Sequence, residues 1–224
     1  MEGKTKTKGR AITLWDFLTG KCLSAMERAI IDRMRELDPS DPNYFKEMRE
    51  LKQRLSVVTP AAVIKSRASG NVEIESYSGI MQIDIDSKVC NNYDIEELKK
   101  EFFKLPFVAY AGRSCSGRGI FILMGIAEPE KLKDYFTHVG DLLETVGIEI
   151  DRSNGYDYHH LRYVSFDPNG LINPDFVPLK IKRFKRKNFG LKKVVSHRTY
   201  EDNINLALPL IEAIEAKQLD FVPE

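Results

Sequence analysis

The chain has 224 residues, of which 42% are hydrophobic and 30% are charged, and its formal net charge at pH 7 is +1. These values are typical of a globular protein with one medium domain and appendages, or with two small domains. The cysteines Cys22, Cys90 and Cys115 form no C-x-x-C pair, which excludes a zinc ribbon and a disulfide framework and predicts free thiols. A run of about 18 apolar residues is also missing, so no membrane span is expected.

The first part of the chain, residues 1–60, is predicted to be a basic arm followed by a helical hairpin. Residues 1–10 are polar and basic and lack the apolar core of a secretory signal, so we expect a cytoplasmic protein. Apolar residues at helical spacing predict helices over residues 23–37 and 42–55. Asp41 is the expected N-cap of the second helix, with Pro42 as its first residue.

Residues 61–180 have a different pattern, in which strands alternate with single helices. Alternating or continuous apolar runs predict strands over residues 80–86, 107–111, 120–126, 148–150 and 159–166. Helices are predicted over residues 94–104, opened by a capping box of Asp94 and Glu97, and 130–146. The order β-α-β-β-α-β-β predicts an α+β fold, a mostly antiparallel sheet with helices on one face.

Asp84 and Asp86 form the first candidate site. Residues two apart on a strand point the same way, so both carboxylates face away from the core that holds Ile83 and Ile85. Two neighbouring carboxylates repel each other unless a cation neutralises them, and Mg²⁺ prefers oxygen ligands. The pair is either a metal site or the solvated acidic face of a strand.

The second candidate is the loop from Arg113 to Gly119, which joins two predicted strands. Its glycines allow close approach of the backbone to a ligand, and two serines and two arginines suit a phosphate. The candidate nucleotide-binding residues here are Arg113, Ser114, Ser116, Gly117, Arg118 and Gly119. The alternative is an ordinary glycine-rich hairpin turn.

Three further polar residues follow on later predicted strands. Asp151 comes directly after an apolar run and could complete a three-acid site, for which Glu149 is a competing candidate. It could equally cap its own loop. His160 and Arg162 share one face of the predicted strand 159–166 and could both contact phosphates.

Residues 181–224 are predicted to form a basic segment followed by a C-terminal helix. Between residues 180 and 193 there are eight basic residues and no acidic one, with Phe184 and Phe189 among them. Cations interleaved with aromatic rings suit a nucleic-acid backbone and stacked bases, although such a run could also be a solvated linker. The candidate nucleic-acid contacts are Lys182, Arg183, Lys185, Arg186 and Lys187.

In combination these motifs resemble the archaeo-eukaryotic primase (primase-polymerase) superfamily, most closely the primase-like domain at the N-terminus of VirE-type proteins of mobile elements and phages. The resemblance covers residues 77–180. The motifs that carry it are Tyr77-Ser78-Gly79, Gln82-Ile83-Asp84-Ile85-Asp86, Ser114-Cys115-Ser116-Gly117-Arg118-Gly119, Ile148-Glu149-Ile150-Asp151, Val164-Ser165-Phe166-Asp167-Pro168 and Asn173-Pro174.

The resemblance implies an RRM-like core that joins nucleoside triphosphates on a single-stranded DNA template during replication of a mobile element or phage. Asp84 and Asp86 match the first acidic motif and Asp151 the third, and these acids would hold two Mg²⁺ or Mn²⁺ ions. The serines and glycines of the loop match the motif that binds the incoming phosphates. The 224 residues contain no helicase motif G-x-x-x-x-G-K-[ST], so any unwinding would come from a partner or from sequence outside this chain.

Three other interpretations stay open. Phe121 stands where the superfamily usually has a histidine or lysine, and His160 stands where an arginine is expected. These two positions favour a non-catalytic nucleic-acid or nucleotide-binding module on the same fold, whereas the presence of all three acids favours an enzyme. Paired acids also serve two-metal nucleases, and a purely structural protein would bind no metal at the acids.

Overall fold

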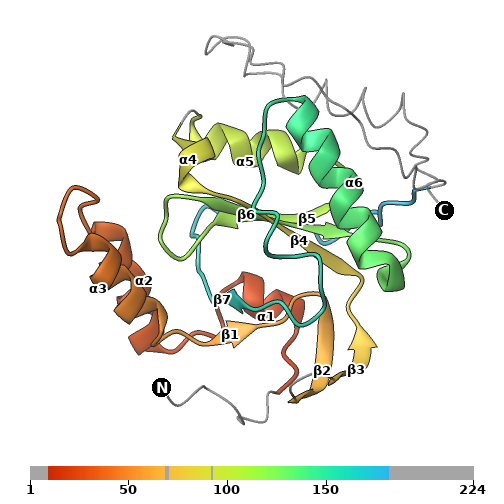
Figure 1. The fold of residues 1–224 in the computed structure, drawn as a ribbon, viewed down its shortest axis with the longest axis horizontal. Coiled ribbons are helices and arrows are strands. Elements are labelled where there is room, and N and C mark those ends of the chain that lie inside the picture. The colour runs from red at the N-terminus through yellow and green to blue at the C-terminus, as the bar shows by residue number, and fades with distance from the viewer. Residues whose placement is uncertain (1–9, 69–70, 92, 182–224) are drawn as a thin grey trace.

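The computed structural model describes residues 10–68, 71–91 and 93–181 (Figure 1). The helices are α1 (Leu14–Leu18), α2 (Ala25–Glu36), α3 (Tyr44–Lys52), α4 (Ser87–Cys90), α5 (Ile95–Phe103), the 3₁₀ helix η1 (Pro129–Lys131) and α6 (Leu132–Thr145). The strands are β1 (Val57–Val58), β2 (Ala62–Ala68), β3 (Asn71–Tyr77), β4 (Ile80–Ile85), β5 (Val108–Arg113), β6 (Ile120–Gly125), β7 (Arg162–Tyr163) and β8 (Leu171–Ile172). None of the helices in these ranges is long and apolar enough to cross a bilayer.

The largest sheet has four strands in the order β4-β6-β5-β8, and all neighbouring strands in it are antiparallel. β4 pairs with β6 so that Asp84 lies opposite Phe121 and Ile85 opposite Ile120. Two smaller antiparallel sheets, β1-β7 and β2-β3, complete the strand pairs. The chain is therefore a mixed α+β protein built on antiparallel sheets, as the order of predicted elements indicated.

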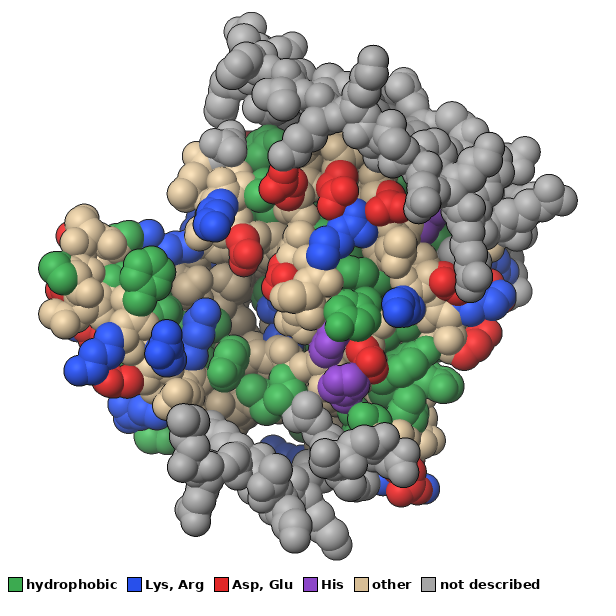
Figure 2. Space-filling view, in the orientation of Figure 1, with side chains coloured by type: hydrophobic (Ala, Val, Ile, Leu, Met, Phe, Trp, Pro, Cys, Tyr) green, Lys and Arg blue, Asp and Glu red, His purple; other side chains and the backbone are tan. Residues whose placement is uncertain are grey.

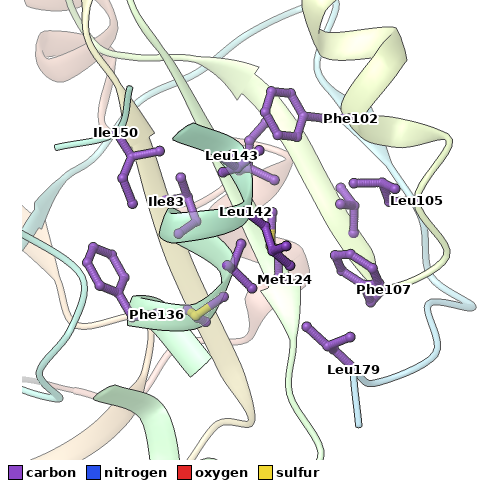
Figure 3. Packing of buried hydrophobic residues seen from close by; sticks show 14 of the residues in the cluster. Ile83, Phe102, Leu105, Phe107, Met124, Phe136, Leu142, Leu143, Ile150 and Leu179 are labelled. Carbon is purple, nitrogen blue, oxygen red and sulfur yellow. The ribbon is translucent and has the colours of Figure 1, made fainter. Parts of the chain in front are cut away.

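One face of the four-stranded sheet is covered by α5 and α6 (Figures 1 and 3). Ile83 of β4 and Met124 of β6 are fully buried there against Phe136, Leu142 and Leu143 of α6. The apolar positions of α6 recur at helical spacing, so the helix presents one continuous apolar stripe to the sheet. This layer forms the larger hydrophobic core.

The opposite face of the sheet is also buried, which differs from the prediction of helices on one face only. Phe121 and Leu123 of β6 point to this side, where they join a second core with residues of α1, α2 and α3. The rings of Phe17 and Phe121 lie 6.4 Å apart between centroids. The physical reason is the sequence of β6, Ile-Phe-Ile-Leu-Met-Gly, which places apolar side chains on both faces of the strand. Neither face can therefore be left to water.

The ends of several elements differ from the sequence-based expectation. α3 begins at Tyr44 with Asn43 as its N-cap, because the Asp41 carboxylate accepts the Asn43 N–H over 2.7 Å and closes a turn before the helix. Asp94 caps α5 as predicted, but the return bond of a capping box is replaced by an ion pair of Glu97 with Lys100, 2.7 Å apart. Local propensity predicted these helices, and nearby polar contacts set their first residues.

Two predicted strands are much shorter or missing. Residues 148–150 form no strand although Ile148 and Ile150 are buried, and the strand expected over 159–166 is reduced to β7. Both segments are buried on one side like strands, but most of their backbone groups have no partner strand in register. An apolar run reports burial and cannot by itself establish strand pairing.

The three cysteines are free thiols, as predicted. Burial raises the pKa of Cys90 to about 11, and it also raises the pKa values of Cys22 and Cys115. Because the thiolate is the reactive form, these residues act as small apolar side chains of the two cores.

Candidate functional site

The predicted acidic pair lies where β4 leads into α4: Asp84 is in the strand, and Asp86 follows its last residue. The Asp84 side chain points to the sheet face opposite Ile83 and Ile85 and is 18% exposed. Asp86 is the exposed N-cap of α4, and its carboxylate makes no capping hydrogen bond. One carboxylate is therefore mostly buried on the strand, and the other is open to solvent just beyond it.

Asp151 lies beside Asp84 although the two are far apart in sequence. Its backbone N–H donates to the carbonyl oxygen of Asp84 over 2.9 Å. Its carboxylate accepts two hydrogen bonds from Ser153, from the N–H over 2.9 Å and from the hydroxyl over 2.6 Å. The third predicted acid is thus a neighbour of the first through the backbone, and its side chain closes its own loop.

Arg162 of β7 is the cation that Asp84 faces. Its guanidinium forms an ion pair with Asp84, and its Nε donates to the Gln82 side-chain oxygen over 3.0 Å. The same group lies over the ring of Phe121, with Cζ 3.9 Å from the centroid, a favourable cation–π contact. Burial lowers the pKa of Arg162 to about 9, so the guanidinium is charged at neutral pH. The ring of Phe121 therefore supports the guanidinium of Arg162.

His160 lies in the loop before β7 and shares no strand face with Arg162. Its Nδ1 accepts a hydrogen bond from the Gly155 N–H over 2.8 Å. Its ring and that of Tyr156 are perpendicular, with the ring centroids 4.5 Å apart. Because β7 begins only at Arg162, the shared strand face predicted for His160 and Arg162 is not formed.

The glycine-rich loop between β5 and β6 packs against the end of β4. The Ser114 N–H donates to the Gly119 carbonyl over 2.8 Å, and Gly117 has a φ of 73°, which favours glycine. A Cβ on Gly119 would lie 2.7 Å from the Ile85 carbonyl oxygen and 3.6 Å from Cα of Asp86. Glycine at this position therefore lets the loop touch the strand that carries the acids.

The polar side chains of the loop have different surroundings. The hydroxyls of Ser114 and Ser116 lie 3.1 Å apart. Arg118 donates to the Leu37 carbonyl over 3.4 Å, and its Cζ lies 5.2 Å from the ring centroid of Tyr44. Arg118 therefore joins the loop to the N-terminal helices, whereas the serines remain together inside the turn.

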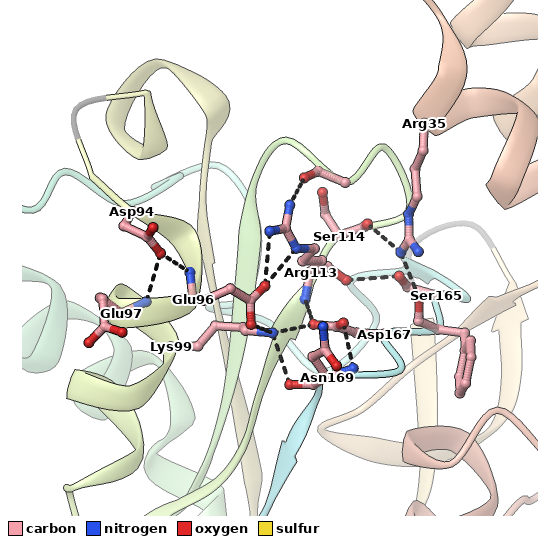
Figure 4. Close-up of polar contacts among 12 residues, drawn as sticks. Arg35, Asp94, Glu96, Glu97, Lys99, Arg113, Ser114, Ser165, Asp167 and Asn169 are labelled. Carbon is pink, nitrogen blue, oxygen red and sulfur yellow. Dashed lines mark hydrogen bonds and ion pairs between the residues drawn. The ribbon is translucent and has the colours of Figure 1, made fainter.

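A charge network centred on the buried pair of Lys99 and Asp167 holds the base of the loop (Figure 4). The Asp167 carboxylate accepts the Lys99 ammonium over 2.7 Å and the backbone N–H of Arg113 over 2.9 Å. The Glu96 carboxylate pairs with two basic side chains: the Lys99 ammonium lies at 2.8 Å and the Arg113 Nε at 2.9 Å. Burial alone would raise the pKa of Asp167, but the hydrogen bonds from Lys99 and Arg113 hold it below the ordinary value of 3.8.

Arg35 of α2 holds the same loop from the other side (Figure 4). Its guanidinium donates to the carbonyl oxygens of Ser114 over 3.3 Å and Phe166 over 2.6 Å. A Cβ on Gly117 would lie 2.9 Å from Cγ of Arg35, so the side chain also packs on the turn. The conformation of the loop is therefore set by residues of α2, α5 and the segment after β7.

The three predicted acids suit a divalent metal by donor type but do not converge here. Carboxylate oxygens are the ligands that Mg²⁺ and Mn²⁺ prefer. In residues 10–68, 71–91 and 93–181, however, no group of three or more His, Cys, Asp or Glu side chains lies close enough to hold a metal ion. Asp84 is paired with Arg162 and Asp151 with Ser153. A metal at these acids would require their side chains to turn toward one another.

The predicted nucleic-acid contacts at Lys182, Arg183, Lys185, Arg186 and Lys187 lie outside the described residues. On the face drawn in Figure 2, acidic and basic side chains are interspersed instead of being separated by sign. The role of the basic segment therefore stays a prediction.

Comparison with known families adds one finding. The family model of the BT4734-like N-terminal domain matches residues 50–171, more than half of the chain. The chain belongs to the BT4734-like N-terminal domain family. Searches of curated proteins and of solved structures found no match.

The BT4734-like region runs from α3 to β8 and contains both sides of the candidate site: the acids of β4, the loop, Asp151 and Arg162. It also contains Lys99 and Asp167, but not Arg35 of α2. The N-terminal helices that cover the second sheet face are thus mostly outside the family match.

Sequence reasoning missed Lys99 and the buried role of Arg162. Lys99 lies four residues after Ile95 and one after Leu98, on the apolar stripe of α5, so a charge there indicated a buried partner. Arg162 alternates in phase with the buried Val164, and Tyr163 between them is exposed. In both cases the spacing of apolar residues indicated that the side chain is buried. The residue that it pairs with belongs to a distant segment and could not be inferred from that spacing.

Proposed function

We propose that this BT4734-like domain is a primase-polymerase-like nucleotidyltransferase that joins nucleoside triphosphates on a single-stranded DNA template, in replication of a mobile element or phage. Mg²⁺ or Mn²⁺ is the proposed cofactor, and a separate helicase would supply unwinding. The observation that carries the proposal is the hydrogen bond from Asp151 N–H to the Asp84 carbonyl oxygen. It brings two acids from distant parts of the chain to one edge of the sheet.

The proposed core is RRM-like. The order β4, α5, β5, β6, α6 is followed by residues 148–151, which lie next to β4 through the Asp151–Asp84 hydrogen bond. The sheet order is β4-β6-β5, and residues 148–151 beside β4 would take the place of the fourth strand. That arrangement would put β4 and β6, the first and third strands, in the middle, as in a β-α-β-β-α-β core. Before this core, α2 and α3 are the proposed helical hairpin, joined by the ion pair of Arg33 and Glu47 at 2.8 Å.

The phosphate-binding part of the proposal rests on the loop between β5 and β6. Its backbone is held by Asp167, by Arg35 and by its own hydrogen bonds, so little conformational entropy would be lost when a ligand binds. Gly119 brings this rigid loop within contact of Ile85 and Asp86. Triphosphate held by the Ser114–Gly119 backbone would therefore lie beside the exposed carboxylate of Asp86.

The chemistry needs positioning and charge neutralisation more than covalent participation by the protein. Divalent ions held by Asp84, Asp86 and Asp151 would supply the charge that activates a 3′-hydroxyl and neutralises the triphosphate. The chain itself would orient the acids, through the strand β4 and its backbone bond to Asp151, and would hold the phosphates on the loop.

A second candidate function is a nucleic-acid or nucleotide-binding module without catalysis. The specific observation in its favour is the ion pair of Asp84 with Arg162, whose guanidinium lies on Phe121. In a protein that needs no metal, the guanidinium of Arg162 can serve as the permanent counter-charge of the Asp84 carboxylate. The two functions differ in whether product forms.

The test is synthesis from labelled ribo- or deoxynucleoside triphosphates on single-stranded DNA, with and without a primer, in Mn²⁺ or Mg²⁺. We expect template-dependent product, reduced by at least about 100-fold in Asp84→Ala and Asp151→Ala, since each removes a carboxylate that orients the reactants. Glu149→Ala is the matched control: Glu149 is exposed and two residues from Asp151, and product should be unchanged.

Three outcomes separate the alternatives. Product that persists in Asp84→Ala would show that the acids do not carry the reaction. No product under any condition, with nucleotide or DNA still bound, would establish the binding module in place of the enzyme. Metal-dependent degradation of the template would assign the acids to a nuclease.

A further inference from the structure

Five aromatic rings lie together where the loop after α6 meets the end of β3. Residues 156–160 read Tyr-Asp-Tyr-His-His, and Tyr77 is the last residue of β3. Between ring centroids, Tyr77 lies 5.0 Å from Tyr158, and His160 lies 5.1 Å from His159 and 4.5 Å from the remaining tyrosine of the loop. Because Tyr158 and His159 are consecutive residues, the two groups of rings adjoin. Together they form an aromatic surface made of Tyr77, Tyr156, Tyr158, His159 and His160.

Three of these rings are each held by a polar contact. The Tyr158 hydroxyl donates to the Pro129 carbonyl over 2.9 Å. The Nδ1 of His159 lies 2.8 Å from a carboxylate oxygen of Asp157, and His160 accepts the backbone hydrogen bond described above. A planar ring whose orientation is already fixed loses little conformational entropy when a ligand packs on it.

The aromatic surface is open to solvent. Tyr77 is 46% exposed and the His159 side chain is 39% exposed, and the other three residues are half-buried. Figure 2 shows histidine side chains beside hydrophobic ones on the drawn face of the molecule. Fixed aromatic rings that reach the solvent are stacking partners for the planar bases of a single strand.

The charges around the rings are mixed. The Lys133 ammonium lies 5.9 Å from the ring centroid of Tyr156, where it can meet a phosphate. Burial raises the pKa of Tyr158, and nearby groups, among them Glu130 and Asp157, add to this effect. The surface is therefore not strongly basic, and stacking on the rings must supply most of the affinity for a strand.

The position of the aromatic surface connects it to the candidate site. Residues 151–155 begin at the hydrogen bond from Asp151 to the Asp84 carbonyl and end at the hydrogen bond from Gly155 to His160. A Cβ on Gly155 would lie 2.6 Å from the Gln82 carbonyl oxygen, so this segment packs directly on β4. A strand that lies on the rings would therefore lie beside the edge of the sheet that carries Asp84.

We propose that the aromatic surface binds single-stranded nucleic acid by stacking its bases on the rings. Two adjoining groups of rings suit successive bases of a strand better than one isolated base. The role of this strand as a template rests on the proposed function, whereas the binding itself would serve the non-catalytic module equally.

The experiment measures binding of the full chain to a fluorescent oligothymidylate of about 12 nucleotides by anisotropy, in EDTA so that no metal contributes. We expect Tyr77→Ala and His159→Ala each to weaken binding at least about fivefold, because each removes a ring on which a base stacks. Tyr77→Phe keeps the ring and should stay within about twofold of the original protein. Phe45→Ala is the matched control: Phe45 is 77% exposed on α3, which lies away from β3 in Figure 1, and affinity should be unchanged.

Stacking predicts two further results that a structural role of the rings would not give. The loss in Tyr77→Ala should be the same factor at about 50 mM and about 200 mM salt, because a tyrosine ring releases no counterions. Lys133→Gln should instead weaken binding mainly at low salt. An abasic strand of the same length has phosphates but no bases, so it should bind Tyr77→Ala and the original protein equally.

The outcomes separate this proposal from the proposed function. Equal binding by the original protein, Tyr77→Ala and His159→Ala would overturn the aromatic surface, while template-dependent synthesis by the original protein would still support the enzyme. Weaker binding by both variants, with no synthesis by the original protein, would support the aromatic surface and overturn the enzyme. An equally large loss with the abasic strand would overturn stacking, and so would failure of the original protein to bind the oligothymidylate.

Discussion

Lys99 and Asp167 form an ion pair that is almost completely shielded from solvent, with 0% and 2% of their side chains exposed and 2.7 Å between them. The pair connects α5 to the segment after β7, and Asp167 also receives the backbone N–H of Arg113. A helix on one side of the sheet is thereby connected to the first residue of the proposed phosphate loop. The stability of this region and the shape of the loop should therefore depend on the same charges.

Replacing Lys99 with methionine should lower the free energy of unfolding by about 3–5 kcal/mol, because it leaves the buried Asp167 carboxylate without its cation. The measurement is urea denaturation followed by circular dichroism. Lys100→Met is the matched control: Lys100 is the next residue, 58% exposed and paired with Glu97, and its loss should change stability by less than about 0.5 kcal/mol. Equal effects of the two substitutions would contradict a special role for the buried pair.

Asp167 should make the protein less stable in acid. Its folded pKa lies below the unfolded value of 3.8, so the carboxylate stabilises the fold fully above that pH. The contribution is lost as pH falls below 3.8 toward the folded pKa, when the native carboxylate must take up a proton. Glu27, with a pKa below 4.5, should act in the same direction.

Urea denaturation at a series of pH values from 7 to below 3.8 checks this expectation. Asp167→Asn should be less stable than the original protein at pH 7, and its stability should fall less steeply with acid. A slope that is unchanged in Asp167→Asn would show that this carboxylate does not contribute to the acid response.

Removing Arg35 should loosen the glycine-rich loop. Arg35→Ala deletes the hydrogen bonds to the Ser114 and Phe166 carbonyls, and the expected loss of stability is about 1–3 kcal/mol. Hydrogen exchange of residues 113–119 should accelerate with it. Arg33→Ala on the same helix removes only an exposed pair with Glu47 and should change neither quantity appreciably.

A methyl group on Gly119 should separate the loop from β4. The added Cβ would lie 2.7 Å from the Ile85 carbonyl oxygen, so Gly119→Ala should cost about 1–3 kcal/mol and accelerate exchange at residues 85–86 and 113–119. Gly147→Ala is the control, because Gly147 has a φ of 86° but no atom within 4 Å of an added Cβ. Its effect should be backbone strain at the end of α6, without faster exchange in the loop.

Local patterns in the sequence predicted the elements of the main sheet and its helices well. β4, β5 and β6 and the helices α5 and α6 follow from apolar periodicity, which depends only on neighbouring residues. The same reasoning placed strands at residues 148–150 and 159–166, where the structure has none or only β7. Whether an extended, buried segment becomes a strand depends on a partner in register, and that partner is distant in sequence.

For the candidate site, too, the sequence indicated the residues and only the tertiary structure established their contacts. Residue types and spacing in the chain identified Asp84, Asp86, Asp151 and the loop as residues of interest, because carboxylates and glycines carry their chemistry wherever they lie. The contacts between them could not be read from the sequence: Asp84 meets Arg162 across 78 residues, and Lys99 meets Asp167 across 68. Such pairs form because both faces of the sheet are covered, which excludes water and leaves each buried charge dependent on an opposite charge from another segment.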